Sequence, residues 1–193
     1  SDGVTARYGT PFTPYTHMSV WNVDEDGKPV DLLGENSEED TGETFWAQDT
    51  LLFGIANQER FLDILNNYIV FTNVPSTAGG TQMLKIIAKP HQYFAVSNAI
   101  TETMRAVTGN QQIGVVWHTQ GSGKSLEMVF YDNIVMRHPS LGNPTTIVIT
   151  DRTDLDDQLF NTFASTQEFL PETPHEIGSI AELRSELRGR QQG

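Results

Sequence analysis

A glycine-rich octapeptide at residues 118–125, His-Thr-Gln-Gly-Ser-Gly-Lys-Ser, constrains the fold of this chain more than any other feature. The run Ile-Gly-Val-Val-Trp at 113–117 is typical of a strand and leads directly into it. A strand that turns through closely spaced glycines into Lys-Ser and a helix is typical of a phosphate-binding loop. The alternative is a structural turn with an exposed lysine, but a chance match of both glycines together with Lys-Ser is rare.

The residue types of this loop indicate how it would hold a nucleotide. Glycine lets backbone N–H groups come close to phosphate oxygens, because a Cβ would block either the turn or the ligand. Lys124 would bring a positive charge to the β- and γ-phosphates, and the Ser125 hydroxyl would complete the oxygen shell of Mg²⁺. The helix that begins near Lys124 adds the positive end of its dipole. His118 departs from the general pattern, which has a small residue at that place.

Composition limits what kind of protein carries the loop. The 193 residues fit one large or two small domains, and no apolar run resembles a membrane span or a signal peptide. The absence of cysteine excludes disulfides and thiolate metal sites and agrees with a cytoplasmic location. Because the chain starts at Ser1 rather than at Met, we expect a piece of a longer protein.

Charge is distributed unevenly along the chain. The net charge of −13 argues against a freestanding DNA-binding domain. Residues 1–80 carry 3 basic and 13 acidic side chains, whereas residues 81–193 carry 9 and 12. A local contact with nucleic acid in the second part therefore remains compatible with the composition.

The first part of the chain predicts three kinds of structure. Residues 1–32 contain strand-like runs at 4–8 and 17–23 that are separated by turn residues. A polar, acidic linker over 33–44 follows. Helical spacing then appears over 51–55 and 57–65, before a short strand at 68–71 and a loop at 73–80. We expect residues 1–40 to be a β-rich segment with an acidic loop and residues 41–80 to be a helical connector.

Residues 81–193 alternate between helical and strand-like patterns. The expected order is a helix at 90–107 opened by Pro90, a strand at 113–117, a helix at 124–137, a strand at 145–150, and helices at 153–164 and 179–189. Alternation of strands and helices predicts a parallel sheet with right-handed crossovers. The predicted fold class is α/β, an incomplete RecA-like P-loop NTPase lobe.

Two segments outside the loop carry candidate binding residues. Gln92, in Lys-Pro-His-Gln-Tyr-Phe at 89–94, has an amide that matches both N6 and N7 of adenine, although an ordinary helix-capping amide explains it equally well. Arg152 and Thr153 follow the predicted strand at 145–150 and could hold a nucleic-acid phosphate. Taken in isolation, a charged helix start is the better explanation of that second segment.

Together, three segments resemble one family, the restriction (R) subunit of type I restriction–modification enzymes, whose motor belongs to helicase superfamily 2. They are Lys-Pro-His-Gln-Tyr-Phe at 89–94, Trp-His-Thr-Gln-Gly-Ser-Gly-Lys-Ser at 117–125, and Ile-Thr-Asp-Arg-Thr-Asp-Leu-Asp-Asp-Gln-Leu-Phe at 149–160. In that family the loop usually begins with His, as it does here. The opening residues 1–10 resemble the stretch after the nuclease core, and the region up to 71 resembles the connection from nuclease to motor. The resemblance thus implies that residues 1–40 are the C-terminal part of the nuclease domain, residues 41–80 a helical connector, and residues 81–193 the N-terminal part of the first RecA-like lobe.

The resemblance implies a function and a set of site residues. The intact protein would use ATP and Mg²⁺ to drive translocation along double-stranded DNA before cutting it, as an ATP-dependent type I site-specific deoxyribonuclease in complex with modification (M) and specificity (S) subunits. Arg152 and Thr153 would contact DNA, and Ser125 would reach Mg²⁺ through the nucleotide. The implied ATP-binding residues are Gln92, Thr119, Gln120, Gly121, Ser122, Gly123, Lys124 and Ser125.

These 193 residues are expected to lack complete nuclease and ATPase sites, and we assign no catalytic residue. No Asp-Glu box follows the loop, and efficient phosphoryl transfer needs parts beyond a P-loop. Asp-Gly-Lys at 26–28 superficially matches half of a nuclease motif, but Asp-Gly is a hairpin-turn signal. Two alternatives stay open at this point: another P-loop enzyme such as a small-molecule kinase, or an inert structural junction.

Overall fold

The computed structural model describes residues 5–32, 45–75, 79–151 and 153–189 of the chain. The chain divides into two units, Ser1–Asn98 and Ala99–Gly193, and the division falls within the long helix α3 (Pro90–Thr108). Pro90 opens this helix as its sequence predicts, because proline fixes a helical φ at a position that needs no N–H donor. The predicted acidic linker at 33–44 lies outside the described residues.

The first unit contains two helices that the sequence predicts. They are α1 (Ala47–Ile55) and α2 (Gln58–Asn67), and a short 3₁₀ turn, η1 (Tyr15–His17), precedes them. The side chain of Asn57 accepts a hydrogen bond from the backbone N–H of Arg60 at 3.1 Å. This bond caps the first turn of α2, which explains why the helix begins there.

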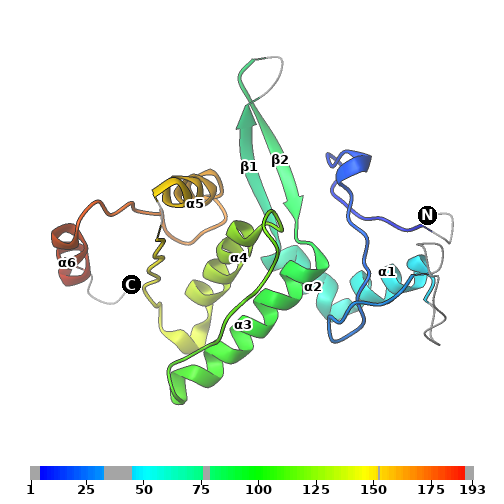
Figure 1. The fold of residues 1–193 in the computed structure, drawn as a ribbon, viewed down its shortest axis with the longest axis horizontal. Coiled ribbons are helices and arrows are strands. Elements are labelled where there is room, and N and C mark those ends of the chain that lie inside the picture. The colour runs from blue at the N-terminus through cyan, green and yellow to red at the C-terminus, as the bar shows by residue number, and fades with distance from the viewer. Residues whose placement is uncertain (1–4, 33–44, 76–78, 152, 190–193) are drawn as a thin grey trace. The chain divides into compact units, whose positions relative to one another are not determined.

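A β-hairpin follows α2 and projects as two long arrows in Figure 1. Its strands are β1 (Ile69–Pro75) and β2 (Thr81–Ile87), paired antiparallel from Ile69 opposite Ile87 to Pro75 opposite Thr81. The predicted short strand at 68–71 is thus confirmed and extended, whereas β2 was missed and the predicted loop at 73–80 is shorter. Cross-strand pairing converts residues with weak individual preferences into a strand.

Aromatic side chains form the core of the first unit. Trp21 is fully buried, and its ring lies 6.1 Å from that of Phe94 and 6.4 Å from that of Tyr93. The guanidinium carbon of Arg60 lies 5.3 to 5.9 Å from the centroids of these three rings. Cation–π attraction of this kind stabilises a site by roughly 0.5–2 kcal/mol.

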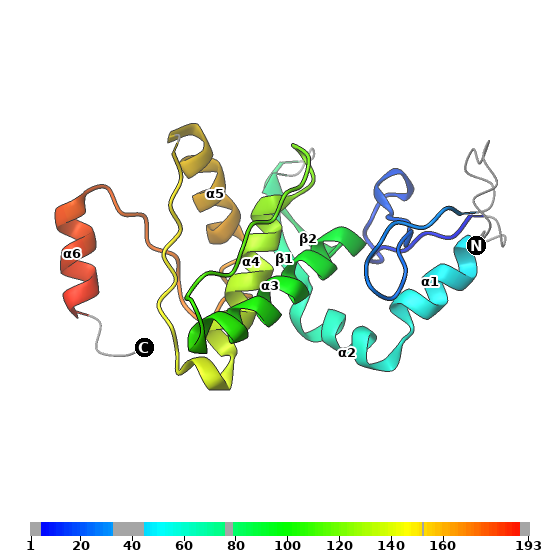
Figure 2. The same cartoon turned by 60° about the horizontal axis from the view of Figure 1, so that its bottom comes forward.

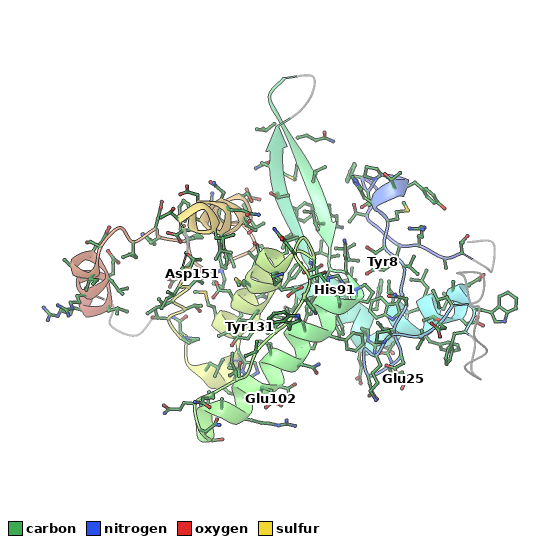
Figure 3. All side chains as sticks on the ribbon, in the orientation of Figure 1. Tyr8, Glu25, His91, Glu102, Tyr131 and Asp151 are labelled. Carbon is green, nitrogen blue, oxygen red and sulfur yellow. The ribbon has the colours of Figure 1, made fainter. Side chains whose placement is uncertain are left out.

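The predicted β-rich start of the chain forms isolated bridges. Tyr8 pairs with Ser19, and Val23 pairs with Pro29, both antiparallel. The Tyr8 hydroxyl, labelled in Figure 3, donates a hydrogen bond to the carbonyl oxygen of Ala88 at 2.9 Å. This hydrogen bond joins the N-terminal segment to the residue that follows β2. Side-chain contacts of this kind, and not a regular sheet, hold the N-terminal segment in place.

The second unit contains the remaining predicted helices. They are α4 (Lys124–Arg137), α5 (Thr153–Ser165) and α6 (Ile180–Gly189), with a 3₁₀ turn, η2 (Pro139–Leu141), after α4. α4 and α5 contact each other and appear as neighbours in Figure 2. Phe130 on α4 packs edge-to-face on Phe169 at 6.0 Å between ring centroids. None of the described helices is long and apolar enough to cross a membrane.

The two strands predicted for the second unit are not formed within its described residues. Segments 113–117 and 145–150 have no regular secondary structure, and Gly114 has a φ of +107°. Val115, Trp117 and Ile149 are 89, 89 and 87% exposed. β-branched and apolar residues favour a pleated, half-buried surface, but a strand requires a paired neighbour. The predicted parallel sheet is therefore absent from the described residues, whose strands form the hairpin.

Candidate functional site

Two glycines with left-handed backbone conformations shape the loop at 118–125. Gly121 has a φ of +80° and Gly123 a φ of +92°. A Cβ added to Gly121 would meet nothing within 4 Å, so the backbone conformation, and not space, requires glycine there. Gly123 is the N-cap of α4, which ties the loop directly to the helix.

The N-cap of α4 is a glycine and therefore has no side chain that could cap the helix. Among the described residues, no side chain forms a capping hydrogen bond at this helix start. The carbonyl oxygen of Gly123 accepts from the backbone N–H groups of Leu126 and Glu127, at 3.0 and 3.2 Å. The N–H groups of a first turn and the helix dipole together favour negative charge, as a phosphate carries.

Lys124 directs its ammonium group back into the loop. Nζ donates hydrogen bonds to the carbonyl oxygens of His118 at 2.9 Å and Thr119 at 2.8 Å. Phosphate oxygens would offer this ammonium stronger, charge-assisted hydrogen bonds than neutral carbonyl oxygens do. The Lys124 ammonium therefore already lies in the loop. Binding of a phosphate would require it only to exchange carbonyl oxygens for phosphate oxygens as hydrogen-bond acceptors.

His118 has a specific partner that accounts for its place in the loop. Its Nδ1 lies 2.8 Å from Oε1 of Glu127, one turn into α4. Glu127 is only 6% exposed, so its carboxylate needs hydrogen-bond donors. Sequence reasoning missed Glu127, although an acidic residue next to the apolar positions Leu126 and Val129 was a signal.

The other predicted loop residues differ in exposure. Thr119, Gln120 and Gly121 are exposed, whereas residues 122–125 are partly buried. The backbone N–H of Ser122 donates to the carbonyl oxygen of Thr119 at 3.3 Å, which closes the turn. The structure thus places all seven predicted loop residues, Thr119 to Ser125, in one turn that opens α4.

Gln92 belongs to the first unit and acts as a cap in the structure. It is 2% exposed, and its Oε1 accepts a hydrogen bond from the backbone N–H of Lys89 at 2.8 Å. The capping role that competed with adenine recognition is therefore observed. Recognition of adenine by Gln92 stays a prediction.

The predicted DNA-contacting pair is only partly described. Arg152 lies outside the described residues, and Thr153 is the exposed first residue of α5. The contact with DNA stays a prediction.

The Asp-Gly-Lys sequence at 26–28 forms a turn. The Oδ1 atom of Asp24 accepts from the backbone N–H groups of Asp26 at 2.9 Å and Lys28 at 2.8 Å. Gly27 has a φ of +82°, and Val23 pairs with Pro29 across the turn. The hairpin-turn interpretation is confirmed.

A cleft of about 490 Å³ in the second unit is a poor candidate for the nucleotide site. Segment 145–150, α5, segment 172–179 and α6 contribute most of its lining. Its described lining residues include no Lys or Arg but five acids: Asp132, Asp156, Glu172, Glu176 and Glu186. Such a cleft would repel a triphosphate, and it does not include the loop at 118–125.

Comparison with known proteins identifies similar chains. The family model described as SWI2/SNF2 ATPase matches residues 91–193. The type I restriction enzyme HindI endonuclease subunit of Haemophilus influenzae is 36% identical over 100% of this chain and 17% of its own length. The putative type I restriction enzyme MjaIXP endonuclease subunit of Methanocaldococcus jannaschii is 30% identical over 97% of this chain and 18% of its own length.

These matches confirm the resemblance to restriction subunits that the three sequence segments indicate. The chain spans less than one fifth of the length of these two relatives, 17 and 18%. No solved structure matches the chain.

Proposed function

Because this chain belongs to the SWI2/SNF2 ATPase family, we propose that residues 118–125 bind the triphosphate of ATP. The observation that carries this proposal is the loop itself. Gly121 and Gly123 adopt positive φ, no side chain among the described residues caps α4, and the Lys124 ammonium already lies against the loop carbonyls. Each of these features favours an anion with several oxygens.

The residues present fit Mg²⁺–ATP by the chemistry of their donors. Lys124 would hold the β- and γ-phosphates, the backbone of 119–123 would surround them, and the Ser125 hydroxyl would complete the Mg²⁺ shell. Bound Mg²⁺–ATP would supply the phosphoryl group that is transferred to water. These 193 residues would bind it without significant hydrolysis, since water activation and an arginine finger need other elements.

The proposal extends to the larger protein. Residues 81–193 would be the N-terminal part of the first RecA-like lobe of a motor, residues 41–80 a helical connector, and residues 1–40 the C-terminal part of a nuclease domain. The parent would be a restriction subunit that binds double-stranded DNA, translocates along it with ATP, and assembles with modification and specificity subunits in the cytoplasm. The similarity of all 193 residues to one part of the HindI endonuclease subunit, 17% of its length, supports this assignment.

Substitution of Lys124 tests the nucleotide site. A fluorescent ATP analogue titrated with Mg²⁺ into the 193-residue chain should bind saturably, and Lys124→Ala should weaken binding about 10-fold or more, because a charge-assisted hydrogen bond contributes roughly 1.5–3 kcal/mol. Lys28→Ala removes the same charge from a side chain that is 75% exposed and should leave binding unchanged. Equal affinity of the Lys124→Ala and wild-type chains would contradict the proposal.

A further inference from the structure

The buried carboxylate of Glu127 is the least expected group near the loop. Glu127 lies in the first turn of α4 and is 6% exposed. Burying an ionised carboxylate without a partner costs on the order of several kcal/mol of folding free energy, so buried carboxylates are usually paired. The His118 ring, at 2.8 Å, provides a partner within the loop that precedes the helix. With Glu127 ionised, the carboxylate only accepts, so Nδ1–H of His118 donates.

His118 is held at two of its atoms. Its ring is bonded to Glu127, and its carbonyl oxygen accepts from the Lys124 ammonium at 2.9 Å. Both partners lie in the first turn of α4, so side chains of the helix hold the residue that begins the loop. Glu127 and Lys124 thus contact the ring and the carbonyl oxygen of the same loop residue.

We propose that Glu127 is a positioning residue for the nucleotide loop. Its carboxylate fixes the His118 ring and, through it, the His118 carbonyl that receives the Lys124 ammonium. A loop fixed in this way binds a triphosphate with less loss of conformational freedom than a mobile loop does. The inference rests on the proposed ATP site, and it assigns Glu127 a role in that site through contacts with protein atoms alone.

The sign of the effect separates positioning from simple electrostatics. Removing a negative charge near an anion site should strengthen nucleotide binding if charge alone matters. Positioning predicts the opposite, because the loop must then be ordered when the nucleotide binds. Glu127→Ala should therefore weaken binding about three- to tenfold, the range that a net hydrogen-bond contribution of 0.5–1.5 kcal/mol produces.

The test compares affinities for the fluorescent ATP analogue across a double-mutant cycle. Glu127→Gln keeps an oxygen acceptor for Nδ1–H and should bind within about twofold of the wild type. His118→Ala, at a side chain that is 22% exposed, should weaken binding as Glu127→Ala does, and the double variant should be no worse than either. The exposed Glu168→Ala is the charge-matched control. Additive losses, or tighter binding by Glu127→Ala, would overturn the proposal.

Hydrogen exchange of residues 118–123 without nucleotide gives a readout that does not depend on the ATP site. Exchange should be faster in Glu127→Ala than in wild type and restored in Glu127→Gln, with circular dichroism to confirm that each variant is folded. If the wild type fails to bind the analogue but this pattern holds, the proposed function fails and the positioning role stands. Unchanged exchange in all variants would overturn the positioning role.

Discussion

At the scale of single residues, one glycine makes room for an aromatic side chain. Gly54 lies within α1, and a Cβ added there would sit 2.1 Å from Nε1 of Trp21. Its carbonyl oxygen also accepts from the Arg60 guanidinium at 2.9 Å. The absence of a side chain at Gly54 is therefore what lets the indole of Trp21 and the cation of Arg60 share one site.

Gly54→Ala separates helix propensity from packing. Propensity alone predicts a gain, since alanine is favoured over glycine in a helix by about 1 kcal/mol. The clash with Trp21 predicts a loss of roughly 1–3 kcal/mol, the usual cost of overpacking. We expect the loss, measured as a lower urea midpoint. Gly178→Ala is the control, because its added Cβ would lie at an ordinary 3.6 Å from Glu182. A raised midpoint for Gly54→Ala would show that the indole moves easily.

At the scale of elements, α4 carries unusual polarity on its buried side. Besides Glu127, it buries Asp132 and Asn133. Tyr131, labelled in Figure 3, shares a 2.7 Å hydrogen bond with the hydroxyl of Thr103 on α3. Burial raises the pKa of Asp132 above its ordinary value of 3.8, while a hydrogen bond from Thr146 opposes the shift. The helix α4 thus begins at the end of the loop at 118–125 and also carries a carboxylate whose charged form is disfavoured by burial.

The raised pKa of Asp132 predicts a pH dependence of stability. The folded chain binds this proton more tightly than the unfolded chain, so the free energy of unfolding falls as pH rises from about 4 through the folded pKa. Asp132→Asn has no charged form and should escape this loss. Its stability advantage over the wild type, measured by urea unfolding, should be small near pH 4 and larger at pH 7. An advantage that is independent of pH would contradict burial of the charged form.

At the scale of the whole chain, apolar side chains of segments 113–117 and 145–150 face solvent. Val115 and Ile149 are 89 and 87% exposed, although their segments have the composition of buried strands. Contiguous exposed apolar surface favours association or the binding of apolar probes. The apolar side chains of these two segments are exposed because neither segment pairs with a strand among the described residues.

The double substitution Val115→Thr and Ile149→Thr tests this exposure. It should reduce fluorescence of the apolar probe ANS while changing stability by no more than about 0.5 kcal/mol, as is usual for surface substitutions. Val129→Thr, at a fully buried side chain of α4, should instead cost about 1–3 kcal/mol. A comparable stability loss in the double variant would show that the two segments are buried in solution.

Much of the local structure follows from short-range patterns in the sequence. Short-range patterns predict the helix over 124–137, the turn at Gly121 and Gly123, and the start of α2 after Asn57. They do so because helix hydrogen bonds and caps join residues three or four apart. The glycine-rich turn at 118–125 is predictable for the same reason. Its glycines and Lys-Ser lie within one turn.

Other features depend on residues that meet only when the chain folds. The antiparallel pairing of β1 with β2, and the missing sheet at 113–117 and 145–150, depend on whether a neighbouring strand is present, which propensity does not encode. The bond between His118 and Glu127 and the capping role of Gln92 depend on side-chain direction and burial. Residue order was sufficient to predict a glycine-rich loop that leads into a helix, whereas the folded arrangement of side chains showed which groups contact that loop.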